Sequence, residues 1–249
     1  MNLYEGIYLR RSIRNYRMEK IEDKVLANIL NFTDHLEMMN EEQQVRFEII
    51  ENVKTKVDGK NIPYYLVLSA YKTEGYQLNA GFLMEQVMLY LMTKGLGSCF
   101  MRYHNLAVHE IEGFEPVIML AFGNTDKNIY REEKKAKRLP LKDMCSFKTA
   151  VSDDIKKILN AARLAPSSLN SQPWCFVAYD NRIHLFCKKS KIPFEPMKKL
   201  QYIDVGIALA NMYLVAEELW YSSEIVKMDN IKEHSFKNNE YLVSIILQS

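Results

Sequence analysis

The chain has 249 residues, with 33 Lys and Arg against 31 Asp and Glu, which leaves a net charge of +2. This near balance argues against a nucleic-acid partner, because proteins that bind the phosphate backbone usually carry a clear cationic excess. Hydrophobic residues make up 48 % and charged residues 26 % of the chain, which is typical of a soluble globular protein. The length allows one large domain or two of about 120 residues each.

Uncharged segments and cysteines predict the compartment. The longest uncharged run, Leu164–Tyr179, contains Pro, Ser, Asn and Gln, whereas a membrane-spanning helix needs about 20 mostly apolar residues. The start of the chain has two Arg and no apolar stretch, so no secretion signal is expected. The four cysteines form no Cys-x-x-Cys pair and have no histidine at zinc spacing. We therefore expect reduced thiols, a cytoplasmic protein, no membrane partner and no metal site.

Helices and strands are predicted in the same order in the two halves of the chain. Each half has an amphipathic helix, apolar strand-like segments, a long helix that is apolar almost all round, and a final apolar strand. In chain order, the expected elements are helix Glu22–Phe32, strand Tyr64–Leu68, helix Gly81–Lys94, strand Pro116–Phe122, helix Ser152–Leu164, strands Cys175–Tyr179 and Ile183–Phe186, helix Asp204–Leu219 and strand Tyr241–Leu247. This order predicts an α+β sandwich that is built twice.

The two halves also align with each other at a nearly constant spacing. At an offset of 125 residues, Gly81 meets Gly206 and the two final strands overlap. An Ile-Leu-Asn tripeptide recurs near the start of each half at an offset of 129 residues. Chance identity is the alternative to a tandem repeat. As a repeat, the chain divides into residues 1–141 and 142–249, which form one integrated unit.

The segment Arg10–Arg14 is the first candidate for binding chemistry. It places three guanidinium groups and one hydroxyl within five residues. Arginine pairs bidentately with phosphate oxygens, so this segment can form a phosphate site. The alternative is a solvated basic helix end.

The segment Ala165–Trp174 is the second candidate. It follows a predicted helix, and its Pro, Ser and Asn residues indicate an ordered loop rich in hydrogen-bonding groups. Such a loop presents amides and hydroxyls to a flat heteroaromatic ring that carries carbonyl and imide groups. The alternative is a turn that ends the helix and places Trp174 in the core.

Together, these two segments resemble the FMN-dependent nitroreductase family, in which an Arg-Arg-Ser-x-Arg segment binds the flavin phosphate and ribityl chain and a Pro-Ser-Ser-x-Asn-x-Gln-Pro-Trp segment binds the ring. Gly95–Cys99 is similar to the family's loop after the long helix, and Lys134–Leu141 is similar to its basic C-terminal stretch. The resemblance covers the whole chain. It implies a nitroreductase-like α/β sandwich with central sheets of antiparallel type and long buried helices.

The resemblance also implies the cofactor-binding residues. Arg10, Ser12 and Arg14 are expected to hold the phosphate, and Lys137 or Arg138 to stabilise the reduced flavin as tuning cations. Ser168 and Asn170 are expected to hydrogen-bond the ring. The complete set is Arg10, Arg11, Ser12, Arg14, Leu96, Gly97, Lys137, Arg138, Pro166, Ser167, Ser168, Asn170 and Gln172.

The order of the motifs departs from the family pattern. The two flavin-binding segments lie about 30 residues apart in a typical member, whereas 156 residues separate Arg10 from Pro166 here. Each half retains only one of them, since Thr33–Glu37 replaces the Pro-Ser-Ser loop in the first half and Leu139–Asp143 replaces the Arg segment in the second. We therefore predict a monomeric, single-chain pseudodimer with one working FMN site.

The resemblance implies an FMN oxidoreductase that works by a ping-pong cycle. NAD(P)H passes hydride to flavin N5, and a flat electron-poor small molecule (a nitroaromatic, quinone or enone) then accepts it. No protein side chain is expected to be catalytic. The alternatives are an FMN-storing or FMN-sensing protein and a flavin-fragmenting or dehalogenating relative. Thr33–Val57 is expected to be either a lid or a surface insertion.

Overall fold

The computed structural model describes residues 1–39, 42–51, 61–102, 108–109, 111–189, 195–229, 231 and 239–248. The chain folds as two compact units, which comprise residues 1–135 and 136–249. Each unit is described by itself. The mixture of helices and sheets confirms the predicted α+β class.

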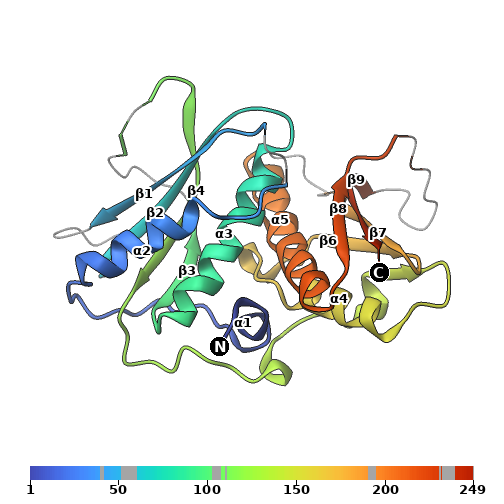
Figure 1. Cartoon of the computed structure of the whole chain (residues 1–249), viewed down its shortest axis with the longest axis horizontal. Helices are drawn as coiled ribbons and strands as arrows, with labels where there is room; N and C mark the ends of the chain where they lie inside the picture. Colours follow the sequence, from blue (N-terminus) through green and yellow to red (C-terminus); the bar gives the residue numbers. More distant parts are fainter. Residues whose placement is uncertain are drawn as a thin grey trace. The chain divides into compact units, whose positions relative to one another are not determined.

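The first unit is a four-stranded antiparallel sheet with helices packed against it (Figure 1). Its strands follow the order β1-β2-β4-β3. The long helix α3 packs against β2, β3 and β4, and it also contacts α1 and α2. The elements are α1 (Leu3–Leu9), α2 (Asp23–Thr33), β1 (Val45–Glu51), β2 (Tyr64–Tyr71), α3 (Tyr76–Thr93), β3 (Gly97–Met101), β4 (Phe114–Gly123) and the 3-10 turn η1 (Glu133–Lys135).

The second unit is a five-stranded sheet in the order β5-β6-β7-β9-β8, in which only the β5–β6 pair is parallel among the described strands. The long helix α5 packs against α4 and against β6, β7 and β8 (Figure 1). The elements are η2 (Leu141–Asp143), β5 (Cys145–Phe147), α4 (Asp153–Leu164), η3 (Ser168–Asn170), β6 (Trp174–Ala178), β7 (Arg182–Lys188), α5 (Glu195–Glu218), β8 (Ser222–Val226) and β9 (Asn239–Gln248).

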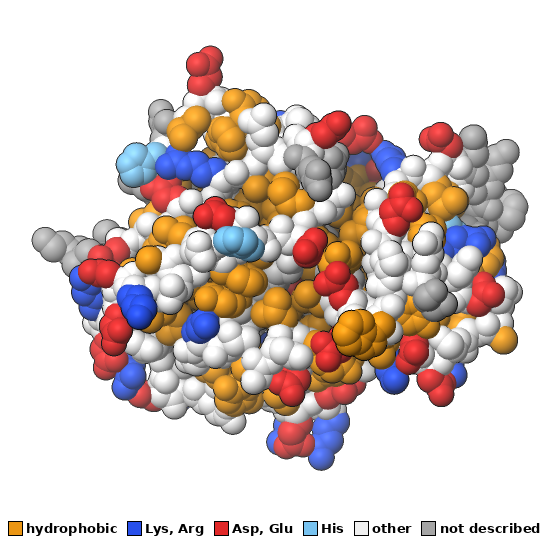
Figure 2. Space-filling view, in the orientation of Figure 1, with side chains coloured by type: hydrophobic (Ala, Val, Ile, Leu, Met, Phe, Trp, Pro, Cys, Tyr) orange, Lys and Arg blue, Asp and Glu red, His pale blue; other side chains and the backbone are white. Residues whose placement is uncertain are grey.

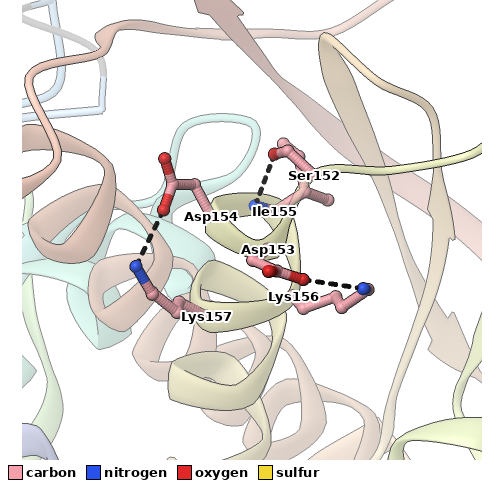
Figure 3. Close-up of polar contacts among 6 residues, drawn as sticks. All are labelled: Ser152, Asp153, Asp154, Ile155, Lys156 and Lys157. Carbon is pink, nitrogen blue, oxygen red and sulfur yellow. Dashed lines mark hydrogen bonds and ion pairs between the residues drawn. The ribbon is translucent and has the colours of Figure 1, made fainter.

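Local sequence signals explain why α4 begins at residue 153. The hydroxyl of Ser152 accepts a hydrogen bond from the Ile155 N–H at 3.2 Å, which satisfies one of the donors left open at a helix start. Asp153 and Asp154 follow in the first turn, where negative charge interacts favourably with the helix dipole. Each also pairs with a lysine three residues later, at 2.8 and 2.9 Å (Figure 3).

All nine predicted elements are present with shifted ends, but five helices and strands of the described residues were not predicted. They are α1, β1, β3, β5 and β8. Strand β1 lies inside the segment Thr33–Val57 and pairs with β2 along its whole length. Residues 45–51 are therefore an edge strand of the sheet, while residues 40–41 and 52–57 lie outside the described residues. The predicted loop at Gly95–Cys99 is also different, because Gly97 already begins β3.

The two units share their sheet registers at the same offset of 125 residues. The last residues of helices α3 and α5 lie 125 residues apart. The same spacing separates strand β3 from β8 and strand β4 from β9. In β4, a register shift leaves Val117 without an opposite residue in β2, and in β9 the same shift occurs at Leu242 opposite β7. A bulge re-aims the strand that carries it and is retained as a specific feature of a fold.

The ends of the two long helices also match. Gly95 and Trp220, again 125 residues apart, both adopt left-handed backbone conformations, with φ of 76° and 66°. The next N–H group, of Leu96 or Tyr221, donates to the carbonyl five residues earlier at 3.0 Å in both cases. This is the Schellman arrangement, whose left-handed position favours glycine because a side chain is strained there. Trp220 keeps the arrangement without glycine, and its side chain is 92 % exposed.

The charged side chains and the cysteines differ in where they lie in the structure. Acidic and basic side chains are interspersed over the face in Figure 2, in agreement with the net charge of +2. All four cysteines are buried. Burial raises the pKa of the Cys175 thiol to about 11 and those of Cys145 and Cys187 to about 12. No helix in the described part of the chain combines the length and apolar character needed to cross a membrane.

Candidate functional site

The segment Arg10–Arg14 begins where α1 ends, and backbone contacts fix it along the start of β3. The Arg10 N–H donates to the Gly6 carbonyl at 2.9 Å and so closes α1. Three residues later, the Ile13 N–H donates to the Ser98 carbonyl at 2.8 Å. A Cβ atom at Gly97 would lie only 2.8 Å from Ile13 Cγ2, so the absence of a side chain there permits the close approach. The structure thus brings the segments Arg10–Arg14 and Gly95–Cys99 together.

Arg10 does not lie at a solvated helix end, which was the alternative to a phosphate site. Its side chain is buried, with 2 % of the residue exposed, and its Nε lies 4.0 Å from Oε1 of the buried Glu85 on α3. Nε and Nη1 of Arg10 have no hydrogen-bond acceptor among the described residues. Burial lowers the pKa of Arg10, while the carboxylate of Glu85 opposes that effect. In contrast, Arg11 and Arg14 are exposed and Ser12 is half-buried.

A further arginine adjoins this segment. Arg131 is held beside it because the Arg131 N–H donates to the Leu9 carbonyl at 2.7 Å and Tyr130 forms a β-bridge with Arg10. Burial lowers the pKa of Arg131, and the charges of Arg10 and Arg11 lower it further. Its Nε and Nη2 are buried without an acceptor in the described part of the chain. We call Arg10, Arg11 and Arg131 the arginine cluster. Such a concentration of like charges with open donors favours the binding of an anion.

In the second unit, the predicted binding loop is ordered and strained. Leu169, Asn170 and Gln172 have φ angles of 53°, 55° and 48°, in the left-handed region that residues other than glycine rarely adopt. Each such residue costs of the order of 1–3 kcal/mol and persists only where its surroundings hold it, as often happens at binding sites. We call residues Ser167–Gln172 the strained loop. Trp174 follows in β6 and is fully buried. The segment Ala165–Trp174 therefore combines an ordered loop with a tryptophan that fills the core.

A buried carboxylate holds one end of the strained loop. The Ser168 N–H donates to both carboxylate oxygens of Asp204 on α5 at 3.0 Å, and the Ser168 hydroxyl donates to Oδ1 at 3.3 Å. Asp204 is 3 % exposed. Burial raises the pKa of Asp204 to about 7, although hydrogen bonds from Ser168 and Ser171 act in the opposite direction.

The basic stretch around Arg138 holds the other end of the loop. The Arg138 guanidinium donates to the carbonyls of Leu164 and Ala165 at 3.1 and 3.0 Å, which closes the C-terminal end of α4, and to Asn170 Oδ1 at 2.9 Å. The Asn170 amide in turn donates to the Lys137 carbonyl at 3.1 Å. The structure therefore joins two predicted sets that lie about 30 residues apart in the chain.

The arrangement refines the roles that the resemblance implied. The side chains of Ser168, Asn170 and Arg138 already have protein partners within the second unit. Gln172 is also engaged, because its Oε1 accepts the Leu139 N–H at 2.8 Å. Pro166 is buried and Ser167 is half-buried, whereas Lys137 is exposed.

Sequence reasoning missed Glu85, Arg131 and Asp204. For Glu85 and Asp204 a signal was available, because a carboxylate in a helix that is apolar almost all round must be buried with a partner. Arg131 lacked such a signal, since its place beside Arg10 depends on a bridge between residues more than a hundred positions apart in sequence.

The chain resembles known proteins over most of its length. Residues 2–216 match the sequence profile of a family described as "Putative TM nitroreductase". A solved "putative nitroreductase" from Thermotoga maritima is 23 % identical, with a TM-score of 0.68 over 100 % of this chain and 95 % of that one. An FMN-dependent nitroreductase from Clostridium difficile is 19 % identical, with a TM-score of 0.46 over 58 % of this chain and 98 % of that one. No curated protein matches the chain. The Thermotoga maritima likeness shows a shared fold.

Proposed function

The chain belongs to the nitroreductase family whose profile it matches, and from this premise we propose that it is an FMN-dependent oxidoreductase. The nitroreductase-like α+β fold is confirmed by the family and by the Thermotoga maritima structure. The proposal adds the cofactor, the electron donor and the acceptor. NAD(P)H is the proposed donor, and a flat electron-poor small molecule is the proposed acceptor.

The arginine cluster is the observation that carries the proposal. Two of its members keep buried guanidinium nitrogens without acceptors among the described residues, and a buried donor without a partner is costly. A bound phosphate supplies acceptors for several such donors at once. The residues therefore fit the phosphate of FMN, and Arg131 joins the set that the resemblance implied.

The strained loop supports the binding of the flavin ring. Because Ser168 and Asn170 are engaged by Asp204 and Arg138, their role is to hold the loop in shape, and the ring meets a surface that is already organised. Leu169 is 92 % exposed at the tip and presents an apolar side chain to a ligand. Lys137 is the exposed cation beside this loop, which favours it over Arg138 as the tuning cation. When bound, FMN supplies the hydride chemistry.

We also propose that the two units descend from one duplicated ancestor and that the chain binds one FMN as a monomer. The matching registers, bulges and helix ends at an offset of 125 residues support the duplication. The single stoichiometry is supported by the motifs, since each unit retains only one of the two flavin-binding segments.

The first experiment is a titration of the purified chain with FMN, with bound flavin quantified per chain. We expect about one FMN per chain. Arg11→Ala and Arg131→Ala should each weaken binding about 10-fold or more, since hydrogen bonds between charged groups contribute about 1.5–3 kcal/mol. Lys127→Ala is the control, because Lys127 is an exposed cation of the same unit. A chain that binds no FMN would refute the proposal.

The second experiment measures oxidation of NADH and of NADPH by the FMN-loaded chain, with a nitroaromatic or a quinone as acceptor. Steady turnover is expected with at least one donor. Tight FMN binding without turnover would refute the enzymatic part of the proposal and favour a storage or sensing role.

A further inference from the structure

The strained loop needs support from outside itself, and Asp204 is the group placed to give it. We propose that Asp204 is a positioning residue whose carboxylate holds the turn at Ser168–Asn170 in the shape that receives the flavin ring. This inference rests on the proposed function, since it assigns a role within the FMN site. Asp204 itself lies behind the loop on α5 and belongs to none of the motifs that suggested FMN.

The geometry shows why a carboxylate is suited to this position. Three donor contacts from Ser168 converge on it: the N–H reaches both oxygens and the hydroxyl reaches one. Ser171 also contributes a hydrogen bond. An ionised carboxylate accepts at two oxygens and has no donor, so it satisfies all these groups at once. An asparagine at this position would offer one acceptor and turn an NH₂ donor toward the other donors.

The equivalent position in the first unit shows what an amide does instead. Asn79 lies 125 residues before Asp204, on α3, and is fully buried. Its Oδ1 accepts the Met39 N–H at 3.4 Å, so it also holds the segment that follows the preceding helix. That contact is longer, and none of the described residues between Phe32 and Met39 has a positive φ. An amide thus suffices to tether a relaxed connection, whereas the strained loop has a buried acid.

Burying an acid is unfavourable for the fold, which argues that the charge serves the loop. A buried ionised carboxylate weakens folding unless its hydrogen bonds offset the loss of water. A residue that lowers the stability of the fold but supports the shape of a binding site is expected where that site requires a strained conformation. Asp204 combines both features: it is 3 % exposed, and its partners lie in the segment with three left-handed residues.

The test compares wild type with Asp204→Asn at pH 8 in three measurements. Amide hydrogen exchange of the peptide covering the strained loop, without FMN, should be about 10-fold or more faster in the variant, as expected for loss of a charge-assisted hydrogen bond. FMN should bind about 10-fold more weakly. The midpoint of thermal unfolding without FMN should not fall.

Asn211→Ala is the matched control. Asn211 is buried on the same helix and donates to the Ala161 carbonyl of α4 at 3.1 Å, so this hydrogen bond does not involve the strained loop. This variant should unfold at lower temperature but keep the FMN affinity of the folded chain. The pattern separates a positioning role from a structural one, because loss of a merely structural group lowers stability and affinity together.

Each outcome decides the matter. Unchanged exchange in the strained loop of Asp204→Asn would overturn the inference, and so would faster exchange with unchanged FMN affinity. If wild type binds no FMN, the proposed function falls, and the exchange rates still decide whether Asp204 holds the loop.

Discussion

The substitution Asp204→Asn should change how the stability of the chain depends on pH. In the folded chain, burial raises the pKa of Asp204 to about 7, compared with 3.8 for an exposed aspartate. Between these two values the folded state keeps a proton that the unfolded state has lost. The contribution of Asp204 to the free energy of unfolding therefore falls as pH rises from about 4 to 7, and it is constant above pH 7.

The magnitude follows from the two pKa values. One pH unit corresponds to about 1.4 kcal/mol, so the difference between about 7 and 3.8 amounts to about 4 kcal/mol at most. Asparagine resembles the protonated aspartic acid in shape and hydrogen bonding and does not titrate. We expect the two proteins to be similarly stable near pH 4, and the variant to be more stable by up to about 4 kcal/mol at pH 8.

The assay is urea unfolding of both proteins without FMN at several pH values from 4 to 8. Other carboxylates titrate in both proteins and cancel in the difference. The thiol of Cys187 stays neutral throughout, because burial and, to a smaller extent, the nearby carboxylates of Glu240 and Asp204 raise its pKa to about 12. Two stability curves that run parallel from pH 4 to 8 would refute the reasoning, and so would a variant that is less stable at pH 8.

Three further predictions concern the stability of other variants. Trp220→Gly should raise the free energy of unfolding by up to about 1 kcal/mol. A left-handed residue with a side chain costs about 1–2 kcal/mol, and the greater entropy that glycine loses on folding offsets part of the relieved strain. Gly97→Ala should lower it by about 1–3 kcal/mol and weaken FMN binding, because the new Cβ meets Ile13 Cγ2 at 2.8 Å. Arg10→Met should destabilise the chain by about 3 kcal/mol, and adding Glu85→Gln should recover part of the loss, since a buried carboxylate then no longer faces an apolar side chain. Denaturant unfolding measures all three.

These predictions can fail separately. A Trp220→Gly variant that is less stable would show that the exposed indole makes contacts that offset its strain. Unaltered stability of Gly97→Ala would show that Ile13 can move without cost. An Arg10→Met variant that gains nothing from the second substitution would show that the two groups do not interact.

The long buried helices were predictable because their signal is local. Helices α3 and α5 are apolar around most of their circumference, and the strands β4 and β9 contain the mainly apolar runs Pro116–Phe122 and Tyr241–Leu247. The elements that were missed are short. Strands β3 and β8 have five residues each and follow a helix end almost directly, so their pattern is too brief to separate from a turn. The seven-residue helix α1 did have a signal, since Asn2 and Glu5 form a capping box.

The candidate site was only partly predictable, because several roles depend on which backbone carbonyls lie nearby. Arg138 is an example: its sequence context marked it as a flavin-tuning cation, whereas its guanidinium closes the end of α4 and holds Asn170. The carbonyls at a helix end attract any neighbouring cation, but only the fold shows which one is within reach. The identity of the loop could be inferred from its residues, and the groups that support it could not.

The burial of the four thiols makes the chain suited to site-specific labelling. A thiolate is the species that reacts with maleimide or iodoacetamide reagents, and three of the four cysteines have pKa values of about 11 or 12 in addition to being buried. None of them needs to be removed before a probe is attached. A cysteine placed at the exposed Leu169 would then be the reactive thiol, and a fluorophore there would report directly on what approaches the tip of the strained loop.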